Sequence, residues 1–359
     1  MINVTKSFLP DINVYQSYLE GIWKRNHLTN HGPLVLELEE KLKNYLGVKH
    51  LFFVNNGTVA LQIALKALEV VGDVITTPFS YIATTSSILW EGLNPVFADI
   101  EPKHLSIDTL EVEKLAKKGI KTLIATHVYG NPCDVEEISR ISKKHNMSVI
   151  YDAAHAFNVK YKDKSILNYG DISTLSFHAT KLFHTIEGGA IITNDDELAH
   201  KISYMRNFGH NGTEKFWGVG INGKSSEFNA AMGLSILPEI NQIITARKNI
   251  FGWYNENLFG LNLETIIVRN DTVYNYAYYP IIFKNEEFLL KSIRALNDYE
   301  IFPRRYFYPS LNTLDFLKHQ PSPIAEDIAS RILCLPLFYD LKEKDVLKIC
   351  KIIKEIIHD

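Results

Sequence analysis

TLSFHATKLFHTIEGGAIITN, residues 174–194, contains two short apolar runs on either side of a turn that carries Lys181. Residues 174–177 and 190–194 have the β-branched and aromatic composition of strands. Similar runs precede them, separated by stretches with helical spacing: LFFV (51–54), VITT (74–77), PVFADI (95–100), TLIATH (122–127) and SVIYDA (148–153). Strands that alternate with helices indicate crossover connections, so we expect an α/β fold with a mostly parallel seven-stranded sheet between helices. Ligands of such sheets bind beyond the carboxyl ends of the strands.

The pattern changes after about residue 227. EFNAAMGLSILPEINQIITARKNIFGWYNENL (227–258) predicts a long helical stretch that Pro238 splits or kinks. Beyond it, VYNYAYYPIIF (273–283) predicts a strand, while residues 286–298 and 344–357 have the apolar spacing of helices. We therefore expect a large domain over residues 1–240, including the N-terminal segment, and a small α+β domain over residues 241–359.

Composition restricts the class of protein. The 359 residues are 46% hydrophobic and 22% charged, and the net charge of −3 leaves no basic stripe for a nucleic acid. The first residues lack the apolar core of a signal peptide, and no stretch approaches the ~18 apolar residues of a membrane helix. The three cysteines are odd in number and far apart, which suits a reducing cytosol. These features predict a cytoplasmic enzyme that has no disulfide and needs no membrane.

Lys181 is the first candidate for chemistry. It follows an apolar run, is flanked by hydroxyl-bearing residues and precedes a Glu-Gly-Gly turn. A lysine that forms a Schiff base needs a partly desolvated position, where its neutral amine is accessible. The alternative is an ordinary solvated lysine.

Asp152 is the second candidate, at the carboxyl end of SVIYD (148–152). A carboxylate buried there costs several kcal/mol unless a cation compensates it. A protonated pyridine nitrogen would be such a cation, and pyridoxal phosphate enzymes use an aspartate in this way. The alternative is an N-cap for the next segment.

Two further segments carry weaker signals. NNGT (55–58) lies between a strand and a helix, where Gly57 lets the backbone approach a phosphate closely. PFSYIATTSS (78–87) follows another strand, and Tyr81 could stack on a planar ring or could be an ordinary core or surface tyrosine.

Two other kinds of site are not supported. GVGINGKS (218–225) has the spacing of a nucleotide phosphate loop, but the polar segment before it is not a core strand. The 13 histidines form neither an HExxH motif nor a cluster with cysteines, so we expect no metal.

The order of these signals resembles that of fold type I pyridoxal phosphate enzymes, and more closely the DegT/StrS group of sugar-nucleotide aminotransferases. The resemblance covers nearly the whole chain. It rests on these segments in order: residues 8–48, NNGTVALQIALKAL, TPFSYIAT, THVYGNPCD, YDAAHA, SFHATK, EGGAI, RNFGHNG, GINGKSSEFNAAMGL and ILCLPL.

The resemblance implies a role for each matching residue. Lys181 would bind pyridoxal 5'-phosphate covalently and later move a proton, Asp152 would keep the pyridine nitrogen protonated, and Tyr81 would stack on the ring. The cofactor phosphate would be held by Gly57, Thr58 and Ser176.

Two positions carry a further implication. His155 stands where many relatives have a glutamine that contacts the ring hydroxyl. Asn222 matches an asparagine that reaches the cofactor phosphate of a neighbouring subunit, so the resemblance implies a homodimer with shared active sites. Ser225 departs from the group, where a methionine is common.

The implied reaction transfers the amino group of L-glutamate to a keto-sugar nucleotide. SFHATK is similar to enzymes that aminate C4 of a 4-keto-6-deoxyhexose, and RRYFYPSLN (304–312) resembles the sugar-facing loop of dTDP-4-amino-4,6-dideoxyglucose transaminases. The expected acceptor is dTDP-4-dehydro-6-deoxyglucose, and the product would serve a surface glycan such as the O-antigen of lipopolysaccharide. The alternatives are a 3-keto, UDP-linked or GDP-linked acceptor, a sugar dehydratase of the same fold, in which histidine replaces the lysine, and a regulator that has lost catalysis.

Overall fold

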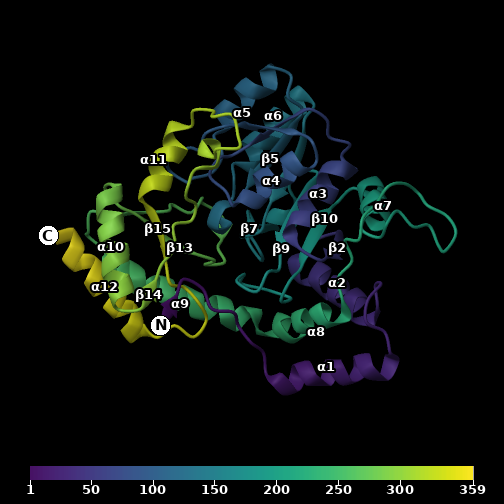
Figure 1. Ribbon diagram of the computed structural model, residues 1–359, viewed down its shortest axis with the longest axis horizontal. Coiled ribbons are helices and arrows are strands. Elements are labelled where there is room, and N and C mark those ends of the chain that lie inside the picture. Colours follow the sequence, from purple (N-terminus) through teal and green to yellow (C-terminus); the bar gives the residue numbers. More distant parts are fainter. Residues whose placement is uncertain (359) are drawn as a thin grey trace.

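The computed structural model describes residues 1–358. A seven-stranded sheet runs through the larger part of the molecule in the order β2-β10-β9-β6-β5-β3-β4 (Figure 1). Its strands are β2 (His50–Val54), β3 (Asp73–Thr76), β4 (Asn94–Phe97), β5 (Thr122–Thr126), β6 (Ser148–Asp152), β9 (Ile172–Ser176) and β10 (Gly189–Thr193). Neighbours from β9 to β4 pair in parallel, while β10 is antiparallel to both β2 and β9. The predicted α/β fold with a mostly parallel sheet is confirmed.

Both faces of this sheet are covered by helices because its strands are apolar on both sides. Ile124 of β5 packs in a cluster with α3, α4 and α7, whereas its neighbours Leu123 and Ala125 pack in another cluster with α2, α5, α6 and α8. Alternate residues of a strand point to opposite faces, which produces this division. The helices of this part are α1 (Ile12–Arg25), α2 (Pro33–Leu46), α3 (Gly57–Ala67), α4 (Ile82–Trp90), α5 (Thr109–Lys117), α6 (Val135–His145), α7 (Asp196–Met205) and α8 (Glu227–Ile236).

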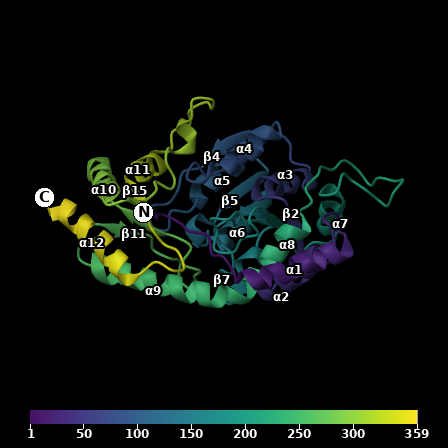
Figure 2. The ribbon, with the colours of Figure 1, turned by 60° about the horizontal axis from the view of Figure 1, so that its bottom comes forward.

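A long helical path leads to the C-terminal part, as predicted. Helix α8 is followed by the 3-10 turn η3 (Leu237–Glu239), which contains Pro238, and by α9 (Ile240–Leu258). In Figure 2 α9 runs along the lower edge, from below α12 at one end towards α1 and α8 at the other. The proline cannot donate a backbone hydrogen bond, so the change of helix type at this point has a direct cause.

The C-terminal part is built on a three-stranded sheet of order β11-β13-β15. Its elements are β11 (Glu264–Thr265), β13 (Tyr279–Ile282), α10 (Glu286–Asp298), β14 (Ile301–Phe302), η4 (Leu311–Thr313), α11 (Pro323–Arg331), β15 (Ile332–Leu335) and α12 (Glu343–His358). The two helices predicted here, over 286–298 and 344–357, are confirmed. A separate apolar cluster joins α9 from Ile250 onward to α10, α12 and this sheet. Ile240 and Ile243 of the same helix still pack with the first part, so we keep the domain division at residue 240 as a proposal.

Short elements connect the two parts. Strand β1 (Ile2–Asn3) pairs in parallel with β14, which ties the N-terminus to the C-terminal part. A second small sheet contains β7 (Lys160–Tyr161), β8 (Lys164–Ser165) and β12 (Thr272–Val273). The 3-10 turn η2 (Ile166–Asn168) follows β8 directly, and η1 (Val128–Gly130) follows β5. No helix in the described residues is long and apolar enough to cross a membrane.

The strand predicted over residues 273–283 is wrong in its extent. Within it, Tyr279–Ile282 forms the strand β13, while residues 274–278 belong to no strand. Tyr276 adopts a positive φ of 54°, and the Asn275 amide donates hydrogen bonds to the carbonyls of His155 and Phe157. The segment therefore supports the turn after β6 instead of pairing with another strand.

Candidate active site

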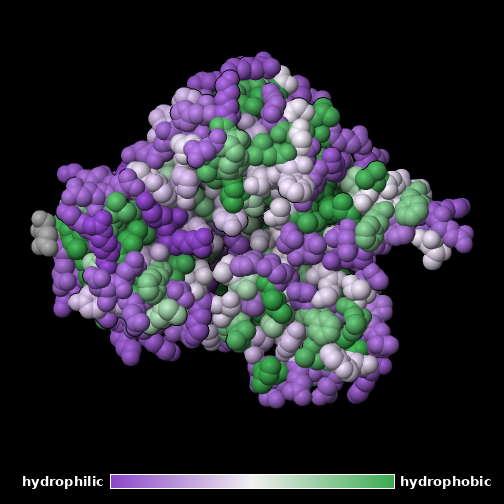
Figure 3. All heavy atoms as spheres, viewed as in Figure 1, coloured by the Kyte–Doolittle hydropathy of each residue, from purple (hydrophilic) through white to green (hydrophobic). Residues whose placement is uncertain are grey.

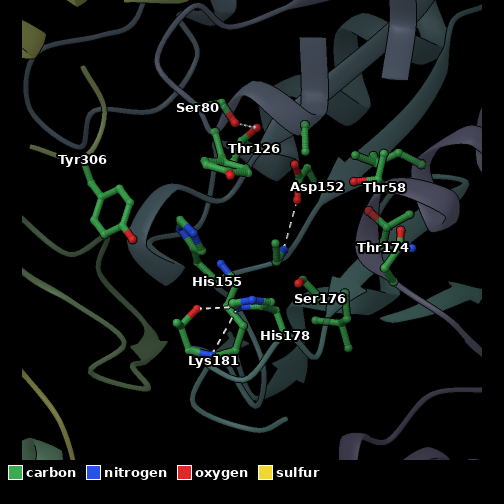
Figure 4. Close-up of a pocket in the computed structure, with 18 of the residues that line it drawn as sticks. Thr58, Ser80, Thr126, Asp152, His155, Thr174, Ser176, His178, Lys181 and Tyr306 are labelled. Carbon is green, nitrogen blue, oxygen red and sulfur yellow. Dashed lines mark hydrogen bonds between the residues drawn. The ribbon is translucent and has the colours of Figure 1, made fainter. Parts of the chain in front are cut away.

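A cavity of about 250 Å³ lies beyond the carboxyl ends of the parallel strands, where the sequence predicted a ligand site. Figure 4 shows side chains from β6, β9 and the turn after β9 facing it, with Tyr306 opposite. The structure brings together around this cavity the predicted residues Gly57, Thr58, Tyr81, Asp152, His155, Ser176 and Lys181.

Asp152 ends β6 and is buried, with a specific polar environment. Thr84 Oγ1 donates a hydrogen bond of 2.7 Å to Oδ2, and the backbone N–H of Ala154 donates one of 3.1 Å to Oδ1. Burial raises the pKa of Asp152, and these two hydrogen bonds and the charge of Lys181 oppose that increase. No helix begins after Asp152, because residues 153–159 form turns, so the N-cap alternative is wrong.

Lys181 lies in the turn after β9, whose shape is fixed by a hydrogen bond from its N–H to the carbonyl of His178 (2.8 Å). Its side chain lines the cavity together with Asp152. Burial lowers the pKa of Lys181 to about 8, although the charges of Asp152 and Tyr81 act in the opposite direction. A larger share of its amine is therefore neutral near pH 8 than for a solvated lysine, as a nucleophilic amine requires.

The N-terminus of α3 closes one side of the cavity. Asn56 caps this helix by accepting a hydrogen bond from Val59 N–H (2.8 Å), which leaves the first backbone N–H groups free to bind an anion. A Cβ atom on Gly57 would lie 3.0 Å from Cβ of Ser176, so only glycine fits without displacing that residue. The hydroxyls of Thr58 and Ser176 face the same space (Figure 4). This cradle fits a phosphate group.

His155 is fixed in one orientation. Its Nδ1 accepts a hydrogen bond from the backbone N–H of Tyr129 (3.1 Å), and its ring lies parallel to that of Phe307, with centroids 5.7 Å apart. Burial, followed by the charge of Lys181, lowers the pKa of His155 well below its ordinary value. The ring is consequently neutral and carries its proton on Nε2, which can donate a hydrogen bond to a ligand oxygen.

Tyr81 occupies the N-cap position of α4 and is 52% exposed at the cavity. Exposure of a large aromatic ring at a cavity wall suits stacking on a planar ligand. The surrounding groups therefore offer a phosphate cradle, a buried carboxylate, a lysine and a neutral imidazole donor, which together fit pyridoxal 5'-phosphate.

Asn222 does not line this cavity. Its Oδ1 accepts a hydrogen bond from Lys224 Nζ (2.9 Å), and its backbone pairs with Asn207. It lines a neighbouring surface hollow that also includes Glu187, a residue of the main cavity. Its role in a partner's site stays a prediction. Residues 206–217 contain no strand in the described structure, consistent with our exclusion of a nucleotide phosphate loop at 218–225.

Sequence reasoning missed several groups of this site. Thr84, which donates to Asp152, and Tyr278 lie in segments whose sequences point to other roles. Arg304 and Phe307 belong to the loop whose resemblance to a sugar-facing segment is the available signal. No group of His, Cys, Asp and Glu side chains in the described residues could hold a metal ion.

The chain is similar to known proteins along nearly its whole length. Residues 12–354 match the model of the DegT/DnrJ/EryC1/StrS aminotransferase family. The chain is 40% identical to a dTDP-4-amino-4,6-dideoxy-D-glucose transaminase of Shigella dysenteriae, over 99% of both chains. It is 32% identical to a GDP-perosamine synthase of Escherichia coli O157:H7, over 97% of this chain and 99% of the other.

Solved structures show the same fold. A crystal structure of DesI in the presence of its TDP-sugar product superimposes with a TM-score of 0.93 and 28% identity, covering 99% of this chain and 92% of that one. PseC of Helicobacter pylori, an aminotransferase in the biosynthesis of pseudoaminic acid, gives a TM-score of 0.92 at 26% identity over 99% of both chains.

Proposed function

The chain belongs to the DegT/DnrJ/EryC1/StrS aminotransferase family, and from this premise we propose that it transfers the amino group of L-glutamate to C4 of dTDP-4-dehydro-6-deoxyglucose. The observation that carries the proposal is the 40% identity to dTDP-4-amino-4,6-dideoxy-D-glucose transaminases of Shigella dysenteriae and Escherichia coli, over at least 98% of each chain. The product would be dTDP-4-amino-4,6-dideoxyglucose, a precursor for a surface glycan such as the O-antigen.

The proposed cofactor is pyridoxal 5'-phosphate, supported by the cradle at Gly57 and by the positions of Asp152 and Lys181. When bound, this cofactor supplies a protonated pyridine ring that withdraws electrons from the carbon losing its proton. Gly57, Thr58 and Ser176 would hold its phosphate, Tyr81 would stack on its ring, and His155 Nε2–H would donate to the ring hydroxyl.

The protein's part in the reaction is to hold and move protons. Asp152 keeps a proton on the pyridine nitrogen, because an ionised carboxylate in a buried site strongly favours a cationic partner. Lys181 accepts the proton from Cα of glutamate, since its lowered pKa makes the free amine available at neutral to slightly alkaline pH. The same amine returns a proton to C4 of the sugar in the second half of the reaction.

We also propose that the active unit is a homodimer. The segment between α7 and α8 projects from the body of the molecule (Figures 1 and 2), and Figure 3 shows apolar surface on it. Its exposed apolar side chains are Phe208, Phe216, Trp217, Val219 and Ile221. Such a patch on a projecting segment favours contact with another protein surface, and Asn222 at its end would then reach the partner's phosphate cradle.

The cytoplasm is the proposed compartment. Cys133, Cys334 and Cys350 are all buried free thiols, which is typical of a reducing environment.

The direct test uses absorbance. The purified protein is mixed with pyridoxal phosphate, and its visible band is followed on addition of glutamate and then of a keto-sugar nucleotide. We expect the band to bleach with glutamate and to return with dTDP-4-dehydro-6-deoxyglucose. Recovery only with a GDP- or UDP-linked sugar would reject the proposed acceptor, and no bleaching with glutamate would reject the donor.

A further inference from the structure

Two adjacent arginines precede the aromatic wall of the cavity, and their surroundings differ. Arg305 is neutralised outside the cavity, where its Nη2 lies 2.6 Å from Glu286 Oε1 and donates a hydrogen bond to the carbonyl of Ser330 (2.7 Å). Arg304 lines the cavity, and among the residues that the structure describes no carboxylate lies within ion-pair distance of it. The structure thus leaves one guanidinium charge at the cavity without an anion.

The position of Arg304 is well defined. Its backbone exchanges two hydrogen bonds with Cys334 of β15, at 3.1 and 2.9 Å, which fixes this part of the loop to the C-terminal sheet. Its guanidinium lies over the ring of Tyr306, 4.8 Å from the centroid. That ring in turn packs edge-on against Tyr278, with centroids 5.6 Å apart. Stacking of this kind holds a guanidinium plane while its N–H donors stay free.

The carboxylates of the cavity do not compete for this charge. Asp152 is bound by Thr84 and Ala154, and Glu187 lies 3.6 Å from His178 Nε2. An incoming anion is therefore the available partner for Arg304, and a guanidinium binds carboxylate and phosphate oxygens in the same bidentate way.

We propose that Arg304 is a shared anion-binding residue, which holds the side-chain carboxylate of glutamate in one half-reaction and the diphosphate of the sugar nucleotide in the other. This inference rests on the proposed function, in which both substrates react in turn at one place. Each carries an anion a few bonds away from its reacting carbon, Cα in glutamate and C4 in the sugar. One fixed cation can serve both, and on this proposal glutamate is a better donor than a neutral amino acid.

The test compares Arg304→Gln with Arg305→Gln, which removes the same charge one position away and outside the cavity. The first readout is the concentration of L-glutamate or L-glutamine needed to bleach the cofactor band. The second is calorimetric binding of dTDP and of thymidine, which involves no turnover. We expect Arg304→Gln to weaken the response to glutamate and the binding of dTDP by about 10- to 100-fold each. Glutamine and thymidine should be unaffected, and Arg304→Lys should lie between Arg304→Gln and the wild type.

The outcomes separate this inference from the proposed function. Unchanged binding in Arg304→Gln, a loss for only one of the two anions, or an equal loss in Arg305→Gln would overturn the shared role while the wild type still reacts with glutamate. A wild-type protein that does not respond to glutamate would instead reject the proposed function, and the inference with it.

Discussion

Two threonines stand side by side on α4, and their hydroxyls have different environments. Thr84 Oγ1 donates to Asp152 and also lies 2.9 Å from Ser80 Oγ. Thr85 Oγ1 is buried without a hydrogen-bond partner in the described residues. The two positions therefore allow the same substitution to be made with and without loss of a contact to the carboxylate.

We expect Thr84→Val to slow the glutamate half-reaction about 10-fold, because a hydrogen bond to a charged group contributes roughly 1.5–3 kcal/mol. Without this donor the pKa of Asp152 rises further and its hold on the pyridine nitrogen weakens. Stopped-flow absorbance would measure the rate. Thr85→Val is the control and should keep the wild-type rate; equal losses in both variants would show that packing, not the hydrogen bond, is responsible.

Lys181 gives a second prediction at this scale, on stability. Its pKa is about 8 in the folded chain and 10.5 as the ordinary value, so between these pH values the unfolded chain binds more protons. The free energy of unfolding therefore rises with pH through that window, relative to a variant without the amine. Cofactor-free Lys181→Met should be more stable than wild type at pH 7, and the difference should shrink towards pH 10.5 in urea titrations. A difference that is constant with pH would contradict the lowered pKa.

Only part of the site could be predicted from single residues. Asp152 ends an apolar run and Lys181 lies four residues past another, so their place at the edge of a sheet is visible in the sequence. Thr84 was not found, since its partner is 68 positions away and nothing local marks the contact. Arg304 looks like Arg305 in the sequence, and only the folded chain shows which of them has a carboxylate.

At the scale of elements, α2 depends on a residue from another helix. Its N-cap is Gly32, which has no side chain to offer, and Glu227 of α8 accepts hydrogen bonds from the backbone N–H groups of Leu34 and Val35 at 3.0–3.1 Å. The Glu227 side chain is fully buried, and Arg25 lies 3.6 Å from it. One carboxylate thus joins the N-terminal segment to the long helical path.

Replacing Glu227 by alanine should lower the free energy of unfolding by about 2–4 kcal/mol, because two backbone donors at the start of α2 lose their buried acceptor and Arg25 loses its ion-pair partner. Chemical denaturation would measure the loss. Glu37→Ala removes an exposed glutamate of α2 that pairs with Lys41, and should change the free energy of unfolding by no more than about 0.5 kcal/mol. Similar losses of unfolding free energy in the two variants would contradict the role of Glu227 as the cap of α2.

The elements also show where sequence patterns fail. Apolar runs predicted all seven strands of the main sheet, because burial on both faces leaves a nearly continuous apolar signal. Residues 274–278 are rich in aromatic side chains, as strands often are. They form no strand, however, and instead support the turn at His155 through the side chain of Asn275. A pattern of tyrosines does not distinguish a strand from an aromatic cluster.

At the scale of the whole molecule, the proposed homodimer gives Asn222 a role in the site of the partner subunit. Asn222 lies at the end of the apolar projecting segment and outside the cavity of its own chain. If it completes a partner's phosphate cradle, two defective chains should restore each other.

Lys181→Ala and Asn222→Asp are designed for this test, the second because it places a negative charge against the phosphate. Each variant alone should be inactive or nearly so. When equal amounts of the two variants are refolded together, half of the dimers should contain one chain of each variant. Each such hybrid has one site with both Lys181 and Asn222 and one site with neither, so the mixture should recover about a quarter of wild-type activity. No recovery in a mixture that forms hybrid dimers would place Asn222 outside the partner's site.

The most direct test of the central claim follows the nitrogen atom. The protein loaded with pyridoxal phosphate is incubated with ¹⁵N-labelled L-glutamate and dTDP-4-dehydro-6-deoxyglucose, and the sugar nucleotide is analysed by mass spectrometry and NMR. We predict an amino sugar with the label on C4, formed together with 2-oxoglutarate. An unchanged keto sugar, or a product without the label, would contradict the account of this chain as a glutamate-dependent sugar aminotransferase.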